Sequence, residues 1–323
     1  MVTACRPAVN RKARPPVAPS GARVEAGALE YNRAVTQPRE RPPRSETREV
    51  TELRQVREHH PELAPAVDLQ IALLELQHRV QGRVPMPWIE FAADWLKVQQ
   101  AAGRPLLRFE EIPLDWTDVR LVFRQTADVL RRHDALEPAD YRALQALARD
   151  GHALEPLVAD WFNRAANPDR PGAAPPRPVA VSAEALDQVL ALTLRPFLER
   201  CAEAVRQRAD FSAWRMASCP LCGGEPELAT LDPHGDRFLV CGRCTTEWRF
   251  DRGVCPFCRN DDRSQLTSFA SRDGLYRLDA CDVCRRYLKA FDARAGHRHV
   301  LLAVDSVATL PLDAAAMQRG YRG

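Results

Sequence analysis

The sequence predicts an α+β protein in which an N-terminal all-helical domain is followed by two tandem β units. Apolar residues recur at helical spacing through residues 47–210, whereas short apolar runs alternate with turn residues beyond residue 210. Four Cys-x-x-Cys pairs lie among those runs, between Cys219 and Cys284. The two parts of the chain therefore differ in both periodicity and composition.

The composition is that of a globular protein of 323 residues, 45% hydrophobic and 28% charged, which is long enough for about two domains. No apolar run approaches the roughly 20 residues that a membrane-spanning helix needs. The first residues, MVTACRPAVNRKARPPVAP, lack the apolar segment of a signal peptide. We therefore expect a cytoplasmic protein without membrane insertion. In that reducing compartment, paired cysteines indicate metal sites and not disulfides.

Changes in composition divide the chain into three segments. Residues 1–46 are rich in proline and arginine and show no apolar period, which predicts a flexible tail. Residues 47–210 form the predicted helical domain. Residues 211–323 form the predicted tandem four-cysteine domain, which ends in a closing hairpin and helix.

Two helices are defined best by their apolar stripes. The first stripe consists of Val119, Val122, Phe123, Thr126, Ala127 and Leu130. The second consists of Leu186, Val189, Leu190, Thr193, Leu194, Phe197 and Cys201, with Ser182 placed to cap the start and Pro196 inside the pattern. Further helices are expected near residues 48–59, 66–81, 88–101, 138–149 and 154–165.

Two other features of the helical half carry predictions. The proline-rich segment 167–178 predicts a surface loop between helices. Core packing is the expected role of the four tryptophans of this half, which are Trp88, Trp95, Trp116 and Trp161.

Beyond residue 210 the pattern is that of hairpins. Residues 228–240 and 266–278 each place turn residues between two apolar runs. Residues 285–304 predict a third hairpin that turns near Gly296. Short apolar strands at 246–250 and 286–291 close the two cysteine units, and residues 305–321 predict one closing helix or two short ones.

The cysteine pairs are candidate metal ligands, because two such pairs separated by a hairpin can present four sulfurs tetrahedrally to one ion. Soft, negatively charged thiolates offset the charge of zinc or iron and hold the ion against exchange. Gly223 supplies the positive φ that such a turn favours, whereas Thr245, Arg259 and Arg285 at the equivalent positions do not. The candidate ligands are Cys219, Cys222, Cys241 and Cys244 for site 1, and Cys255, Cys258, Cys281 and Cys284 for site 2.

This grouping assumes that consecutive pairs share an ion. CPLC and CPFC each begin a unit, a hairpin follows, and an apolar strand closes it, which makes an internal repeat of about 36 to 40 residues. The alternative joins the first pair to the third and the second to the fourth, as in a cross-braced finger. The repeat favours the sequential grouping.

Spacing leaves the identity of the metal open between a structural zinc ribbon and a rubredoxin-type iron centre. On the residues alone zinc is favoured, because structural zinc ribbons are the commoner of the two. The remaining cysteines have simpler explanations, since Cys201 lies on an apolar helical stripe and Cys5 lies in the tail. The clustered histidines, which are His59, His60, His297 and His299, are expected to be solvated.

Charge and motif content exclude other classes of function. The formal net charge is +3, from 46 basic and 43 acidic residues, and the eight thiolates with two divalent ions leave residues 211–323 near neutrality. Such a surface is a poor match for nucleic acid, so no nucleic-acid partner is expected. The sequence has no Gly-rich phosphate loop, nucleophile elbow or paired-carboxylate motif, so we expect no catalytic residues and no enzyme activity.

The cysteine region resembles the formate dehydrogenase accessory protein FdhE family. The residues that carry the resemblance are CPLCGGEPELA, CGRCTTEWRFDRGVCPFC, LDACDVCRRYLKAF and DSVATLPLDAAAMQRGY, in this order and spacing. Within the last segment, Asp305, Leu312-Asp313 and Gly320-Tyr321 match the family as well as the cysteines do. The resemblance is strong from Ser218 onward, looser through residues 47–217, and does not cover residues 1–46.

The resemblance implies a cytoplasmic maturation factor needed for active respiratory formate dehydrogenase, which contacts the catalytic subunit of that enzyme. It also implies two rubredoxin-like iron ions, which reverses the preference for zinc. Two alternatives remain at this point. One is a structural zinc-ribbon protein that binds nucleic acid or another protein, and the other is a rubredoxin-like electron carrier.

Overall fold

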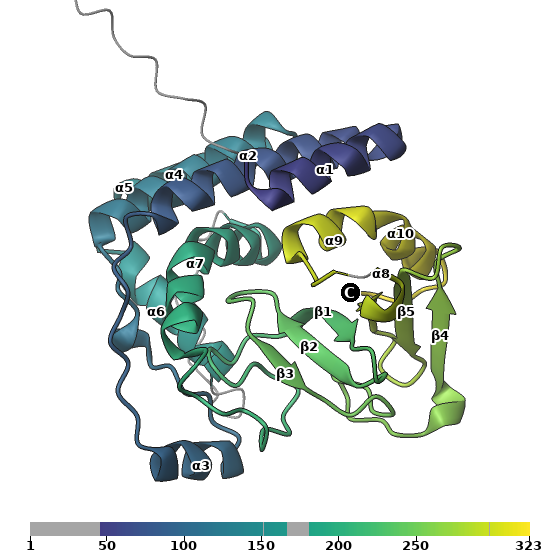
Figure 1. Ribbon diagram of the computed structural model, residues 1–323. Helices are drawn as coiled ribbons and strands as arrows, with labels where there is room; N and C mark the ends of the chain where they lie inside the picture. Colours follow the sequence, from purple (N-terminus) through teal and green to yellow (C-terminus); the bar gives the residue numbers. More distant parts are fainter. Residues whose placement is uncertain (1–45, 151, 167–180, 297) are drawn as a thin grey trace, which may run out of the picture. The chain divides into compact units, whose positions relative to one another are not determined.

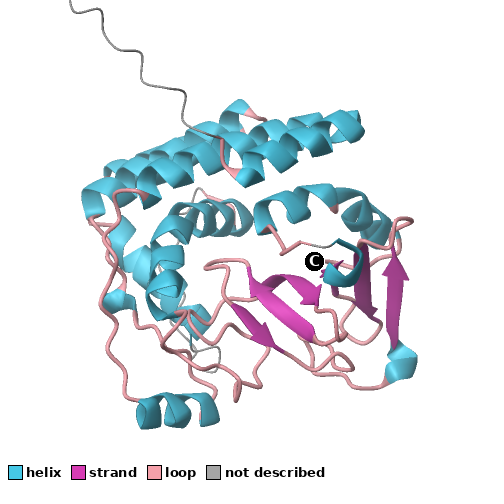
Figure 2. Ribbon diagram, viewed as in Figure 1, coloured by secondary structure: helices cyan, strands magenta, loops and turns pink. Residues whose placement is uncertain are grey.

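The computed structural model describes residues 46–150, 152–166, 181–296 and 298–323 (Figure 1). The expected tail therefore lies outside the described residues except at its last position, as do the proline-rich loop 167–178, Cys5 and His297. Among the described residues, the regular elements as far as Val205 are all helices, the strands follow, and short helices come last (Figure 2).

Seven α-helices precede the sheet in the described chain. They are α1 (Arg48–His59), α2 (Ala64–Gln81), α3 (Ala93–Ala101), α4 (Trp116–Arg132), α5 (Pro138–Arg149), α6 (Leu154–Ala166) and α7 (Ala183–Val205). The predicted apolar stripe of α4 is entirely buried, and Asp115 caps this helix by accepting hydrogen bonds from the amides of Thr117 and Asp118. In α7 the Ser182 hydroxyl accepts from the amide of Ala185, as predicted, and Cys201 is fully buried.

The predicted helix at 88–101 is wrong in its first turn, because α3 begins only at Ala93. Ile89 lies in the irregular segment that precedes α3, and its side chain is buried in the core. This burial keeps the segment from joining the helix. Two predicted core tryptophans are also misplaced, since Trp88 is 76% exposed and Trp95 37% exposed. The Trp88 ring lies under the Arg208 guanidinium, 4.6 Å from its centroid, and not in the core. Trp161 is buried as expected, and Trp116 is partly buried against the same core.

Six strands form one sheet with the order β3-β2-β1-β6-β5-β4. The strands are β1 (Pro226–Leu231), β2 (Arg237–Cys241), β3 (Glu247–Arg249), β4 (Leu266–Ala270), β5 (Tyr276–Cys281) and β6 (Tyr287–Asp292). Two predicted hairpins are confirmed as the antiparallel pairs β1–β2 and β4–β5. Each unit is therefore a three-stranded meander, and the parallel pairing of β1 with β6 joins the two units.

The predicted third hairpin at 285–304 is wrong. Both edges of β6 are already occupied, by β1 and by β5, so no further strand can pair with it. The chain turns instead into α8 (Ala293–Gly296), where a Cβ on Gly296 would collide with Cζ of Phe291. The expected closing helix is present as two short ones, α9 (Leu302–Ala308) and α10 (Leu310–Gln318).

The helices and the sheet share one apolar core. Phe197 of α7 and Trp248 of β3 belong to the same buried cluster. The amides of Leu106 and Leu107 donate to the carbonyls of Pro220 and Leu221, which ties the loop after α3 to the first cysteine pair. α9 packs on α1 and α2 through Val304 and its neighbours, so the C-terminal helices bridge the helical half and the sheet (Figure 1).

Candidate metal centres

All four cysteine pairs are built on one repeated backbone turn. In each turn the amide of the first cysteine donates to the carbonyl five residues later, and the amide four residues later donates back to the carbonyl of that cysteine. These two bonds reverse the chain tightly and bring both thiols of the pair to the same side. The four turns begin at Cys219, Cys241, Cys255 and Cys281. The N···O distances of their two backbone hydrogen bonds are 2.8 to 3.1 Å.

The fifth residue of each turn has a left-handed backbone. Gly223 does so at φ 75°, as its sequence position predicts. Thr245 (57°), Arg259 (64°) and Arg285 (58°) take the same conformation although they carry a Cβ, which the sequence analysis missed. The two backbone hydrogen bonds impose this φ regardless of residue type, so three of the four turns hold an unfavourable residue.

The structure brings the eight cysteines together in two sets of four. In each set the sulfurs all lie within 4.8 Å of one another. The sets follow the sequential grouping, so the crossed alternative is not the arrangement adopted. The first set is Cys219, Cys222, Cys241 and Cys244, and the second is Cys255, Cys258, Cys281 and Cys284.

The donor set fits a tetrahedral ion. Four sulfurs at about 2.3 Å from a central metal would stand about 3.8 Å from each other. Sulfur contacts of 3.5 Å in the first set, and of 3.6 and 3.7 Å in the second, are close to that spacing and far too long for a disulfide. The amides of Leu221 and Arg243 donate to the sulfurs of Cys219 and Cys241, which stabilises negative charge on those atoms.

Comparison with known proteins points to one family. The family model described as "FdhE, central domain" matches residues 218–252, which include the first two cysteine pairs. A protein FdhE homolog of Aquifex aeolicus is 31% identical over 133 residues, which cover 40% of this chain and 46% of that protein. Protein FdhE of Escherichia coli O1:K1 is 30% identical over 119 residues, which cover 36% of this chain and 38% of that protein. These matches show that the cysteine region of the chain is similar to the FdhE family.

The match spans less than half the length of these FdhE relatives. The crystal structure of the FdhE protein from Pseudomonas aeruginosa extends the likeness in fold, with a TM-score of 0.56 over 85% of this chain and 91% of that one. At 23% identity this likeness concerns the fold alone. It supports the α+β architecture in which helices precede the two cysteine units.

The two cysteine sets differ in burial. All four cysteines of the first set are fully buried and belong to the main core. Burial raises the pKa of the Cys219 and Cys244 thiols well above the usual value, whereas at Cys241 hydrogen bonds from the other three thiols outweigh burial and lower the pKa, so a bound cation must displace protons from this set. In the second set Cys258 and Cys284 reach solvent. The first set is therefore a sealed site and the second an open one.

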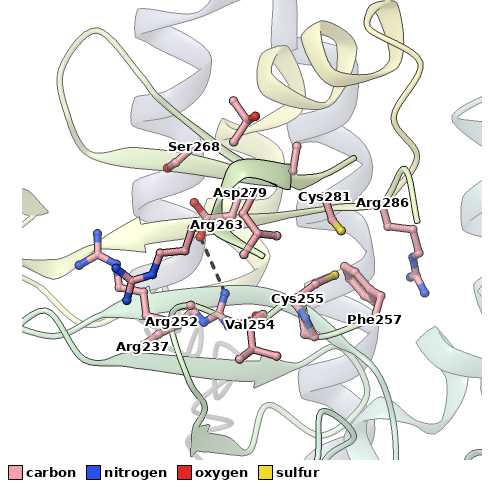
Figure 3. Close-up of a pocket in the computed structure, with 15 residues that line it drawn as sticks. Arg237, Arg252, Val254, Cys255, Phe257, Arg263, Ser268, Asp279, Cys281 and Arg286 are labelled. Atoms are coloured by element: carbon pink, nitrogen blue, oxygen red, sulfur yellow. Dashed lines mark hydrogen bonds and ion pairs between the residues drawn. The ribbon is translucent and has the colours of Figure 1, made fainter. Parts of the chain in front are cut away.

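Four arginines line a cavity beside the open set, and sequence reasoning missed them as candidate site residues. Arg237, Arg252, Arg263 and Arg286 line a cavity of about 410 Å³ together with Cys255 and Cys281 (Figure 3). Arg237 lies on β2, Arg252 follows β3, Arg263 precedes β4 and Arg286 directly precedes β6, so no local sequence motif identifies them. Arg286 stacks on Phe257, with its guanidinium carbon 3.7 Å from the ring centroid.

The remaining candidates stay apart from both sets. Cys201 is a core residue, and burial raises the pKa of its thiol to about 12. His59, His60 and His299 are exposed, as expected. Asp305 and Asp313, which matched the family, bond within the fold: Asp305 accepts from the Tyr276 hydroxyl, and Asp313 pairs with Lys289 at 2.7 Å. Over the part of the chain that the structure describes, no helix is both long and apolar enough to cross a membrane.

Proposed function

We propose that this chain, which is similar to the FdhE family, is a cytoplasmic accessory factor, and not an enzyme, that is required for the activity of a respiratory formate dehydrogenase. In this proposal it binds the catalytic subunit of that enzyme as a client. The observation that carries the proposal is the pair of four-sulfur sets built on one sheet, the first of which lies within the segment that matches the family. The helical half shares its core with that sheet, so the two parts would keep the same relative position when the protein docks on a client.

We propose further that each set holds one iron ion in a rubredoxin-like tetrathiolate site. Cys219, Cys222, Cys241 and Cys244 would hold the first ion, and Cys255, Cys258, Cys281 and Cys284 the second. Such an ion, when bound, supplies one-electron chemistry and fixes the turns that carry its ligands. The same sulfurs also suit zinc, which would serve structure alone. Ferric tetrathiolate protein is red and zinc protein is colourless, so absorbance with metal analysis separates the two.

Client binding is tested by affinity purification of the full chain from native cytosol, with metal analysis of the same sample. The proposal expects recovery of a formate dehydrogenase catalytic subunit and about two iron ions per chain. Recovery of nucleic acid in place of that subunit would favour a zinc-ribbon binding protein. Full formate-dependent activity with residues 1–210 deleted would instead favour a free electron carrier.

Variants separate a redox role from a structural one. Cys255→Ser is placed in the open set, and Cys201→Ala serves as the control because it removes a thiol that belongs to neither set. The control should keep both ions and restore formate oxidation in cells that lack their own accessory factor. If Cys255→Ser protein folds, binds its client and restores formate oxidation fully, a redox role of the open site is excluded.

A further inference from the structure

The cavity beside the open cysteine set has two chemically different ends (Figure 3). Arg237, Arg252 and Arg263 lie toward one end, while Cys255 and Phe257 lie toward the other. The cavity brings β2 of the first unit opposite β4 and β5 of the second. Its volume of about 410 Å³ falls within the range of sites that hold small molecules, about 300 to 1,000 Å³.

Arg237 is a buried cation with an unused donor. Its side chain is only 3% exposed, and its Nη2 donates to the carbonyls of Asp251 and Val254. Its Nη1 lies 3.9 Å from a carboxylate oxygen of Asp279. Its Nε, which is also buried, has no hydrogen-bond partner. Because a buried donor without an acceptor is costly, the protein alone does not fully satisfy the Arg237 guanidinium that lines the cavity.

Two further arginines of the same end have free charge. Within the described chain neither Arg252 nor Arg263 has a carboxylate oxygen within 4.0 Å, although both line the cavity. Arg286 differs from them, because both of its terminal nitrogens donate to Glu225. Asp279 is the one carboxylate in the lining, and it faces Arg237. Asp251, outside the lining, also acts on Arg237, so three guanidinium groups at this end face two carboxylates and a surplus of positive charge is left.

Charge balance with the cysteines does not account for this surplus. Thiolates of the second set would attract nearby cations, and Arg237 has a Coulomb interaction with Cys255. Arg252 and Arg263, however, lie toward the end of the cavity away from the labelled sulfurs (Figure 3). Three guanidinium groups at one end suit a tetrahedral dianion, which has more acceptor oxygens than a carboxylate.

We propose that this cavity binds a small molecule that carries a phosphate group and an aromatic or other apolar body. The phosphate occupies the end formed by Arg237, Arg252 and Arg263. The apolar body lies toward Phe257, with Val254 and Leu266 among the apolar walls. This site is separate from the metal-ligand role proposed for the cysteines, and its occupation does not require a formate dehydrogenase client.

The test is calorimetric titration of the full-length, metal-loaded protein with phenyl phosphate at low ionic strength. Phenyl phosphate should bind at least about tenfold more tightly than inorganic phosphate or phenol, because each of these offers only half of the contacts. Arg252→Ala and Arg263→Ala should each weaken binding about tenfold. Arg272→Ala, an exposed arginine in the β4–β5 turn outside the cavity, should change it less than about twofold.

Isotope-edited NMR of the unaltered protein supplies a second measurement that does not depend on variants. Phenyl phosphate should shift the methyl resonances of Val254 and Leu266. The proposal is overturned if phenyl phosphate shows no saturable binding, if Arg272→Ala weakens binding as much as Arg263→Ala does, or if the shifted methyl groups lie away from the cavity. Equal affinity for phenol would also overturn it, because the arginines would then contribute nothing.

Discussion

The side-chain amide of Gln77 on α2 donates a hydrogen bond of 3.1 Å to the backbone carbonyl of Leu192 on α7. That carbonyl is four residues before Pro196, which has no N–H to offer it. Gln77 is only 5% exposed, so water has little access to replace it. A residue 115 positions away in sequence thus satisfies the acceptor that the proline leaves open inside the helix.

This relationship predicts a strong coupling between Gln77 and Pro196. Gln77→Leu should lower the free energy of unfolding by about 1 to 2 kcal/mol, because it leaves a buried carbonyl without a donor. Pro196→Ala returns an amide to Leu192, so Gln77→Leu should cost about 1 kcal/mol less in that background. Urea unfolding of the four proteins measures this cycle. Equal costs in both backgrounds would show that Gln77 acts through packing alone.

The left-handed turns predict a stabilising substitution at Thr245. A β-branched residue at φ 57° is strained, and glycine has no such penalty. Thr245→Gly should raise the free energy of unfolding by up to about 1 kcal/mol. Thr245→Ala is the matched control, because it also loses the hydroxyl bond to the Cys244 carbonyl but keeps the Cβ. A glycine variant no more stable than the alanine variant would contradict the assignment of strain.

The buried carboxyl group of Glu199 on α7 predicts that its replacement by glutamine stabilises the protein by an amount that depends on pH. Burial, with the Glu49 carboxylate nearby, raises its pKa from 4.5 to about 7. The folded protein therefore binds more protons than the unfolded chain between about pH 4.5 and 7, and the free energy of unfolding falls as the pH rises through that window. Glu199→Gln should add on the order of 1 kcal/mol at pH 8 and almost nothing at pH 4.5.

Unfolding curves at both pH values test this sign. Exposed Glu75 on α2 supplies the control, because Glu75→Gln makes the same chemical change at a solvent-exposed position. A Glu199→Gln gain that is as large at pH 4.5 as at pH 8 would show that its cause is not the ionisation of Glu199.

The features that the sequence predicted well are those that short segments specify. The grouping of the cysteines follows from two-residue spacings and from hairpins with strong turn residues, such as Asp273-Gly274. The stripe of α4 follows from its own periodicity, and all six of its predicted residues are buried. In each case residues close together in the chain make the decisive interactions, so the local sequence pattern predicts the structure without knowledge of the whole fold.

The features that the sequence missed depend on partners far along the chain. Residues after Phe291 could not form a hairpin because β1, about 60 positions earlier, already pairs with β6. Trp88 lies outside the core because its neighbour Ile89 is the residue that is buried there. Arg237 gains its buried position only when β2 and β5 face each other across the cavity, so nothing in its local sequence marks it.

The difference in burial between the two cysteine sets predicts that their metal ions leave in order. The first set is sealed within the core, whereas Cys258 and Cys284 of the second reach solvent. A chelator added to the folded, metal-loaded protein should therefore remove one ion in a fast phase and the other only as slowly as the protein unfolds. Alkylation during the fast phase, read by peptide mass spectrometry, should label the second set alone.

Two matched serine variants extend this prediction from kinetics to stability. Cys258→Ser should lose one ion yet keep a cooperative unfolding transition, because Cys258 itself is exposed and its set lies outside the main core. Cys222→Ser should lose the cooperative transition, since it opens a fully buried set packed against Leu221 and the rest of the main core. Loss of both ions at one rate, or equal destabilisation by the two variants, would mean that the two sites act as a single unit through the shared sheet.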